Sequence, residues 1–80
     1  MIRLVFLGRL AELAGAGELE LVTSAALGLE TILSKLNTPL AEALGDVRIK
    51  LALNGVLLPR EGLIAAPGDE LAFLPPVSGG

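Results

Sequence analysis

The last residues of the chain are the ones whose types and spacing could do chemistry. The sequence ends in Pro-Pro-Val-Ser-Gly-Gly over residues 75–80. Glycine has no Cβ, so Gly79 and Gly80 can pass through a narrow channel in backbone conformations that other residues rarely adopt. The terminal carboxylate is then left unhindered for activation. We expect Gly80 to be the reactive residue and Val77, Ser78 and Gly79 to form the arm that enters another protein's active site.

The two prolines before this arm mark the point where the last strand must end. Pro75 and Pro76 have no N–H group and a fixed φ, so a strand cannot continue through them and the chain must leave the sheet. The sequence therefore predicts one folded domain over residues 1–74 and an extended C-terminal tail over residues 75–80.

The composition excludes most catalytic chemistry within the chain itself. The 80 residues include no cysteine and no histidine, so disulfides, thiolate nucleophiles, thiolate metal sites and the usual general base are all ruled out. The nine acidic residues show no calcium-loop spacing. We expect no metal site and no active site beyond the C-terminal carboxylate.

Charge and hydrophobicity narrow the choice of partners. The net charge is −3, no run of Lys or Arg occurs, and Phe6 and Phe73 are the only aromatic residues, so binding to nucleic acid is not expected. No apolar run approaches the roughly 18 residues of a membrane span, and the expected location is the cytoplasm. At 52% hydrophobic, the chain has apolar residues to spare for a partner surface.

The apolar pattern predicts an α+β fold. Strands are expected at 2–7, 18–22, 48–53, 56–58 and 70–74, with a helical turn at 9–14. Asn54-Gly55 is typical of a type I′ hairpin turn, and Pro67-Gly68 suits the centre of a type II turn. This order predicts a mixed sheet of four or five strands, packed on one main helix.

The main helix is expected between residues 24 and 37. Thr23 and Ser24 are its N-cap candidates and Asn37 its C-cap candidate. One apolar stripe at helical spacing consists of Leu29, Ile32, Leu33 and Leu36. A second short helix is expected from Thr38-Pro39 to Gly45.

Alternation along the strands predicts which residues face away from the helices. If Ile49, Leu51 and Leu53 face inward, Arg48, Lys50 and Ala52 face outward. The same parity places an apolar group on the outer face beside Pro75 and Pro76, consisting of Val5, Leu7, Ala52, Ala72 and Leu74, with Leu57 joining it from the next strand. An apolar patch next to the reactive end predicts a partner interface.

The C-terminal residues resemble those of a known protein family. Residues 73–80, preceded by Gly-Asp-Glu-Leu-Ala at 68–72, closely resemble the ending of the small subunit of molybdopterin synthase (MoaD-type sulfur carriers). The hairpin at 51–55 and the opening at 2–13 are similar too, whereas residues 16–46 match in pattern only. The resemblance implies a β-grasp (ubiquitin-like) fold with a protruding C-terminal tail.

The resemblance also implies a function. In this family an ATP-dependent activating enzyme adenylates the C-terminal glycine, and a persulfide from a sulfur donor of the desulfurase or rhodanese type displaces AMP. The resulting thiocarboxylate enters the large synthase subunit and donates sulfur to cyclic pyranopterin monophosphate during molybdenum cofactor biosynthesis. By resemblance, the synthase is a heterotetramer and the small subunit binds no cofactor.

Three alternatives remain open at this stage. A thiamine-pathway sulfur carrier shares the fold and the Gly-Gly chemistry, although its tail typically lacks the Pro-Pro pair. A ubiquitin-like protein modifier shares the activation step and differs in its acceptor. A plain interaction module would use the apolar face and carry an inert tail, and its function would survive deletion of Gly79 and Gly80.

Overall fold

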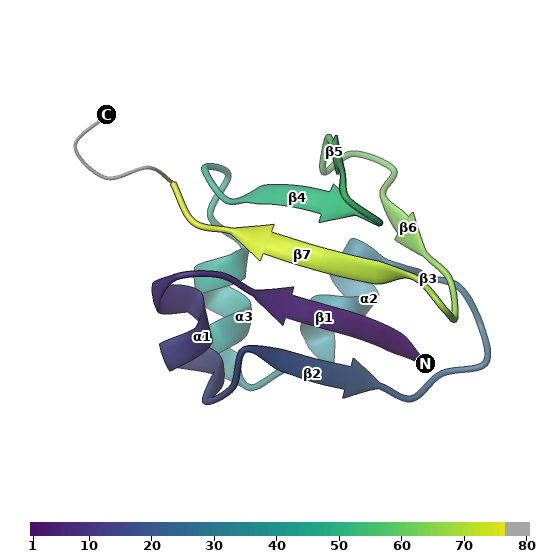
Figure 1. Cartoon of the computed structure of the whole chain (residues 1–80), viewed down its shortest axis with the longest axis horizontal. Helices are drawn as coiled ribbons and strands as arrows, with labels where there is room; N and C mark the ends of the chain where they lie inside the picture. Colours follow the sequence, from purple (N-terminus) through teal and green to yellow (C-terminus); the bar gives the residue numbers. More distant parts are fainter. Residues whose placement is uncertain (77–80) are drawn as a thin grey trace.

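The computed structural model describes residues 1–76, and the predicted arm of Val77, Ser78, Gly79 and Gly80 lies outside the described residues. Figure 1 shows the elements within this range. Their bounds are β1 Ile2–Phe6, α1 Arg9–Ala14, β2 Glu18–Leu21, β3 Leu27–Gly28, α2 Leu29–Ser34, α3 Thr38–Leu44, β4 Lys50–Leu53, β5 Val56–Leu58, β6 Ile64–Ala65 and β7 Glu70–Leu74.

The main sheet has five strands in the order β2-β1-β7-β4-β5. The central strand β7 is parallel to its neighbour β1, and every other neighbouring pair in the order is antiparallel. Parallel neighbours need a crossover connection, and here most of the chain lies between them. The predicted α+β class and mixed, ubiquitin-like β-grasp sheet are confirmed.

The predicted strand parity is confirmed as well. Ile2, Leu4 and Phe6 are buried, whereas Arg3 between them is exposed. Phe6 stacks on Phe73 of β7, with ring centroids 5.6 Å apart and planes 10° from parallel. The core between the sheet and the helices consists of Ile2, Leu4, Phe6, Leu10, Leu29, Ile32, Leu40, Leu44, Ile49, Leu51, Leu63, Ala65, Leu71 and Phe73.

The start of the main helix differs from the prediction. Thr23 and Ser24 do not cap it: the Thr23 hydroxyl closes a local turn with the backbone of Ala25, and α2 begins at Leu29 after Gly28. Residues Leu27–Gly28 instead form β3 and pair with β6 in a small second sheet. Neither two-residue strand was predicted, because two residues are too few to show a period and the pairing is long-range.

The end of this helix also differs. Asn37 was expected to end the main helix but is the N-cap of α3, where its side-chain oxygen accepts a hydrogen bond from the Leu40 backbone N–H at 2.9 Å. The predicted end of α3 at Gly45 is confirmed. Arg60 donates to the backbone carbonyls of Leu44 and Asp46 there, which satisfies acceptors that a helix end leaves open.

The sheet is therefore covered by more than one helix. In Figure 1, α2 and α3 lie behind the sheet, and α1 lies at the end where β1 and β7 finish. Leu29 and Ile32 of α2 and Leu40 and Leu44 of α3 are all buried. The second short helix that the sequence predicted after Asn37 therefore shares the covering of the sheet with the main helix, whereas one main helix was expected to cover it.

Both predicted turns are present, and one side-chain pair links them. Asn54 and Gly55 have φ values of 51° and 85°, as a type I′ turn requires. The Asn54 amide donates to the Asp69 carboxylate at 3.0 Å and accepts from the Glu70 backbone N–H at 2.9 Å. Asp69 also accepts from the Ala66 backbone N–H at 2.8 Å. The hairpin turn is thereby fixed to the start of β7.

Asp69 makes a pH-dependent contribution to stability. The Ala66 backbone N–H, and then the Asn54 amide, hold the pKa of the Asp69 carboxyl below its ordinary value of 3.8. A lowered folded-state pKa stabilises the fold above 3.8, and this stabilisation is lost as the pH falls through the lowered value. We expect Asp69→Asn to unfold more easily than the parent at neutral pH, with the difference shrinking below pH 3.8. Urea unfolding across the pH range measures this, and a difference independent of pH would contradict it.

Candidate functional site

The strand register assembles an apolar row across the outer face of the sheet. Val5 of β1 lies opposite Ala72 of β7, Ala72 opposite Ala52 of β4, and Ala52 opposite Leu57 of β5. Helices α2 and α3 lie behind the sheet and α1 lies at its end, so this face is left uncovered (Figure 1). Leu57 is 64% exposed. Side chains that the sequence places on four different strands thus form one continuous surface.

A second apolar pair lies closer to the end of β7. The Leu7 backbone N–H donates to the Phe73 carbonyl at 3.1 Å, so the exit of β1 stays beside that of β7. Leu7 is 42% exposed, and Leu74 is half-buried and paired with Lys50 of β4. We call the combined surface the outer patch; it consists of Val5, Leu7, Ala52, Leu57, Ala72 and Leu74.

The other end of the outer face is polar. Arg3 of β1 lies opposite Glu20 on one side and Glu70 on the other, and its guanidinium lies 4.0 Å from the Glu18 carboxylate and 3.8 Å from that of Glu70. These side chains are about half exposed, so the pairs add little stability. Their effect is to confine the apolar surface to the half of the sheet nearer the end of β7.

Pro75 and Pro76 lie at the base of the predicted tail. They border a groove of about 190 Å³ between α1 and α3, whose apolar lining consists of Leu10, Leu13, Ala43 and Ile49. Sequence analysis missed this groove, because its lining comes from three segments that are distant in the sequence, residues 9–13, 42–49 and 75–76, and no local pattern predicts their contact. Pro75 and Pro76 were expected to contact a partner; the structure also places them against this domain.

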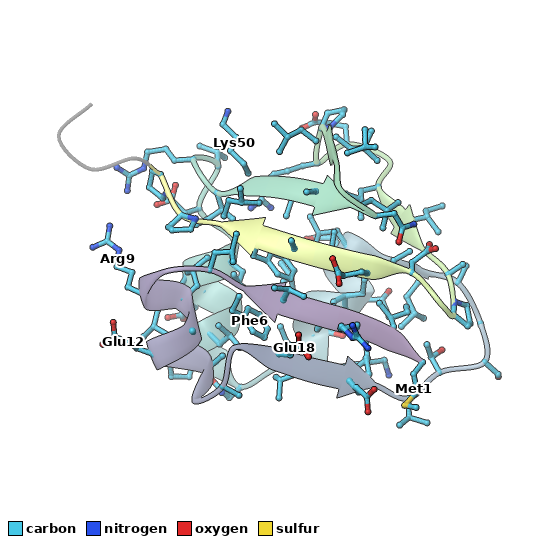
Figure 2. All side chains as sticks on the ribbon, viewed as in Figure 1. Met1, Phe6, Arg9, Glu12, Glu18 and Lys50 are labelled. Carbon is cyan, nitrogen blue, oxygen red and sulfur yellow. The ribbon has the colours of Figure 1, made fainter. Side chains whose placement is uncertain are left out.

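Basic side chains surround the same end. Figure 2 shows Arg9 and Lys50 at the end of the molecule where β7 finishes. Arg48 pairs with Asp46, with guanidinium-to-carboxylate distances of 2.8 and 3.2 Å, and its backbone N–H donates to the same carboxylate at 2.8 Å. The Arg48 side chain, and then its backbone N–H, lower the pKa of Asp46 to about 2. Asp46 is therefore a carboxylate at neutral pH and offsets the charge of Arg48.

The predicted site residues fall into two groups. The structure aligns Val5, Ala72 and Leu57 in one row and keeps Leu7 and Leu74 near the end of β7. Pro75 and Pro76 border the groove between α1 and α3, and Val77, Ser78, Gly79 and Gly80 lie outside the described range. Among residues 1–76, no group of three carboxylates could hold a metal ion. No helix in the described range is long and apolar enough to cross a membrane. The described residues thus form an apolar surface that ends near the C-terminal end of β7.

Comparison with known proteins agrees with the fold. The model of the ThiS family matches residues 4–80. No curated protein matches the sequence.

Solved structures give close matches over the whole chain. SAMP1 from Haloferax volcanii is 30% identical, with a TM-score of 0.66 over 99% of this chain and 98% of that one. Another structure, of H. volcanii small archaeal modifier protein 1, is 28% identical, with a TM-score of 0.62 over 95% and 97%. A complex of subunits 1 and 2 of molybdopterin-converting factor from Helicobacter pylori matches at 22% identity, with a TM-score of 0.63 over 99% and 97%, and shows the shared fold.

The pairing of Asp46 with Arg48 can be tested directly. We expect the Asp46 carboxyl carbon to titrate with a pKa of about 2, and Arg48→Gln to return it toward 3.8 because the guanidinium hydrogen bonds are lost. Carbon-detected NMR titration measures both values. Arg9→Gln is the control, since Arg9 borders the same groove without bonding to Asp46. An Asp46 pKa unmoved by Arg48→Gln would contradict the assigned cause.

Proposed function

The chain belongs to the ThiS family of ubiquitin-fold sulfur carriers, and from this premise we propose that it is the sulfur-carrier subunit of molybdopterin synthase. One observation supports the proposal above the others. The outer patch ends at Leu74, and the next residues are Pro75 and Pro76, which lead to the terminal Gly-Gly. A partner that covers the patch is thereby placed where the tail begins.

The outer patch has the composition of an interface centre. Its six members are aliphatic, and the charged residues on the same face, including Arg3 and Lys50, lie at its borders. Interface cores are depleted in charge and rimmed by polar groups. Three side chains of the patch are alanine or valine, so a partner can approach the backbone of β1, β4 and β7 closely. We propose that the activating enzyme and the large synthase subunit use this surface in turn.

The proposed chemistry takes place at Gly80. An oxygen of its carboxylate attacks the α-phosphorus of ATP on the activating enzyme, and pyrophosphate leaves. The mixed anhydride has a good leaving group, so the terminal sulfur of a persulfide on the sulfur donor attacks the carbonyl carbon and AMP departs. A thiol then reduces the acyl disulfide, which leaves the thiocarboxylate and a protein disulfide. The sequence has no cysteine or histidine, so these partners supply the nucleophile and the reductant.

The large synthase subunit is the proposed acceptor. Val77, Ser78 and Gly79 would thread into its active site, where the thiocarboxylate sulfur displaces an oxygen substituent from a carbon of cyclic pyranopterin monophosphate. Water then cleaves the acyl–sulfur bond, which leaves the sulfur on the pterin and returns the carrier as a carboxylate. Two such transfers complete the dithiolene of molybdopterin. Pro75 and Pro76 favour this pathway over the thiamine pathway, whose carriers typically lack the pair. We further propose a heterotetrameric synthase in the cytoplasm, with no cofactor held by this chain.

A second function has its own support. The structure at 30% identity is SAMP1, and H. volcanii small archaeal modifier protein 1 is 28% identical; these are higher identities than that of the molybdopterin-converting factor subunit. A modifier would use the same adenylation at Gly80 and transfer the acyl group to a lysine amine instead of accepting sulfur. The activation step is therefore common to both functions, and the product separates them.

The first test is the mass of the intact chain after incubation with ATP, a persulfide donor and the purified activating enzyme of its host. We expect the exchange of one oxygen for sulfur at Gly80, because the adenylate is attacked by sulfur. Deletion of Gly80 is the control and should abolish the change. An isopeptide adduct without the sulfur exchange would favour the modifier, and no change with an enzyme active on another carrier would refute both functions.

The outer patch is tested by placing a charge in it. We expect Leu57→Asp to weaken binding to the large synthase subunit by about tenfold or more, because an aspartate there would be desolvated without a partner. Val22→Asp is the control: Val22 is 83% exposed and follows β2 outside the patch. Calorimetric titration of the large subunit with each variant measures the affinities, and equal affinities would show that the patch is not the interface.

A further inference from the structure

Gly8 and Pro75 meet at the point where both central strands end. Phe6 and Phe73 are opposite each other in the parallel register, and Gly8 and Pro75 each follow two residues later. A Cβ added to Gly8 would lie 3.2 Å from the Pro75 Cγ and 4.0 Å from its Cδ, and the shorter distance is below ordinary van der Waals contact. The proline ring therefore packs on the bare Cα of Gly8.

The backbone of Gly8 also has a conformation that favours glycine. Its φ is 57° and its ψ is −136°, a combination that residues with a Cβ strongly disfavour. This conformation turns the chain from β1 into α1 at once: the Leu10 N–H donates to the Leu7 carbonyl and the Ala11 N–H to the Gly8 carbonyl, each at 3.1 Å. Leu10 is buried as a result, and α1 becomes one wall of the groove beside Pro75 and Pro76.

We infer that Gly8 is a positioning residue that sets the direction in which the tail leaves the domain. It does so in two ways: it leaves space for the Pro75 ring, and its backbone places α1 as the wall against which Pro75 and Pro76 lie. This inference rests on the proposed function, since a preset exit matters only if the tail must reach another protein's active site. Fixing Pro75 and Pro76 before binding lowers the entropy cost of presenting the residues that follow them.

The kinetic test compares Gly8→Ala with a matched glycine. Gly15 also has a positive φ, 77°, but an added Cβ there would meet nothing within 4 Å. We expect Gly8→Ala to raise the KM of the activating enzyme for the carrier by about three- to tenfold with kcat nearly unchanged, because a misdirected tail reaches the site less often. Gly15→Ala should leave KM as in the parent. Equal KM values for the two variants would overturn the inference.

Removing the proline ring provides a second test of the inference. Pro75→Ala deletes the Cγ that an alanine at position 8 would crowd, so the two substitutions should be less than additive in KM. Additive effects would show that the Gly8–Pro75 contact does not set the exit. If Gly8→Ala does not fold, Pro75→Ala alone tests the contact: a shift of the Gly8 amide resonance supports it, and an unshifted Gly8 resonance overturns it.

An NMR measurement that does not depend on activity separates this inference from the proposed function. We expect Gly8→Ala to shift the NMR resonances of Leu74 and Pro76, and Gly15→Ala to leave them in place. If the parent chain is never adenylated, the proposed function fails, yet these shifts still decide whether Gly8 directs the exit. Unshifted Pro76 resonances in Gly8→Ala would overturn the inference even if the carrier chemistry is confirmed.

Discussion

The parallel pairing of β1 with β7 is the constraint on which the rest of the structure depends. It joins the first and last strands of the domain at the centre of the sheet, and the stacked rings of Phe6 and Phe73 lie on its buried side. Because the strands run the same way, both finish at one end of the molecule. The exit of the tail, the start of α1 and the outer patch are therefore neighbours. An antiparallel pairing would have placed the start of β1 there instead.

The two faces of this sheet explain the unusual apolar content. A chain that is 52% hydrophobic fills one core between the sheet and three short helices in the described residues, and the remainder includes the outer patch. Charged side chains lie at one edge of the sheet. Glu18 and Glu20 belong to the edge strand β2, where charge discourages pairing with another sheet. Exposed apolar side chains also lie outside the outer patch, among them Val22, Val47, Val56 and Ile64, so the outer patch is one part of the exposed apolar surface.

The three helices of the described residues contribute to the structure in different ways. Helices α2 and α3 supply buried leucines and isoleucine to the core, and α3 is fixed at both ends, by Asn37 and by Arg60. Helix α1 contributes Leu10 to the core and also borders the groove beside Pro75 and Pro76. A domain of this size therefore uses one of its helices both to bury apolar area and to support the residues that precede the arm.

The sequence by itself determined the five strands of the main sheet, the hairpin turn, the type II turn and the side of each of these strands that faces the core. These follow from local periodicity and from the φ preferences of glycine, asparagine and proline. It also predicted the members of the outer patch, since parity needs only the spacing along each strand. Tertiary structure alone decided the pairing of β3 with β6, the start of α2 at Leu29, the role of Asn37 and the contact of Gly8 with Pro75. Each of these depends on segments distant in the chain, or on a choice between two caps that local propensity leaves equal.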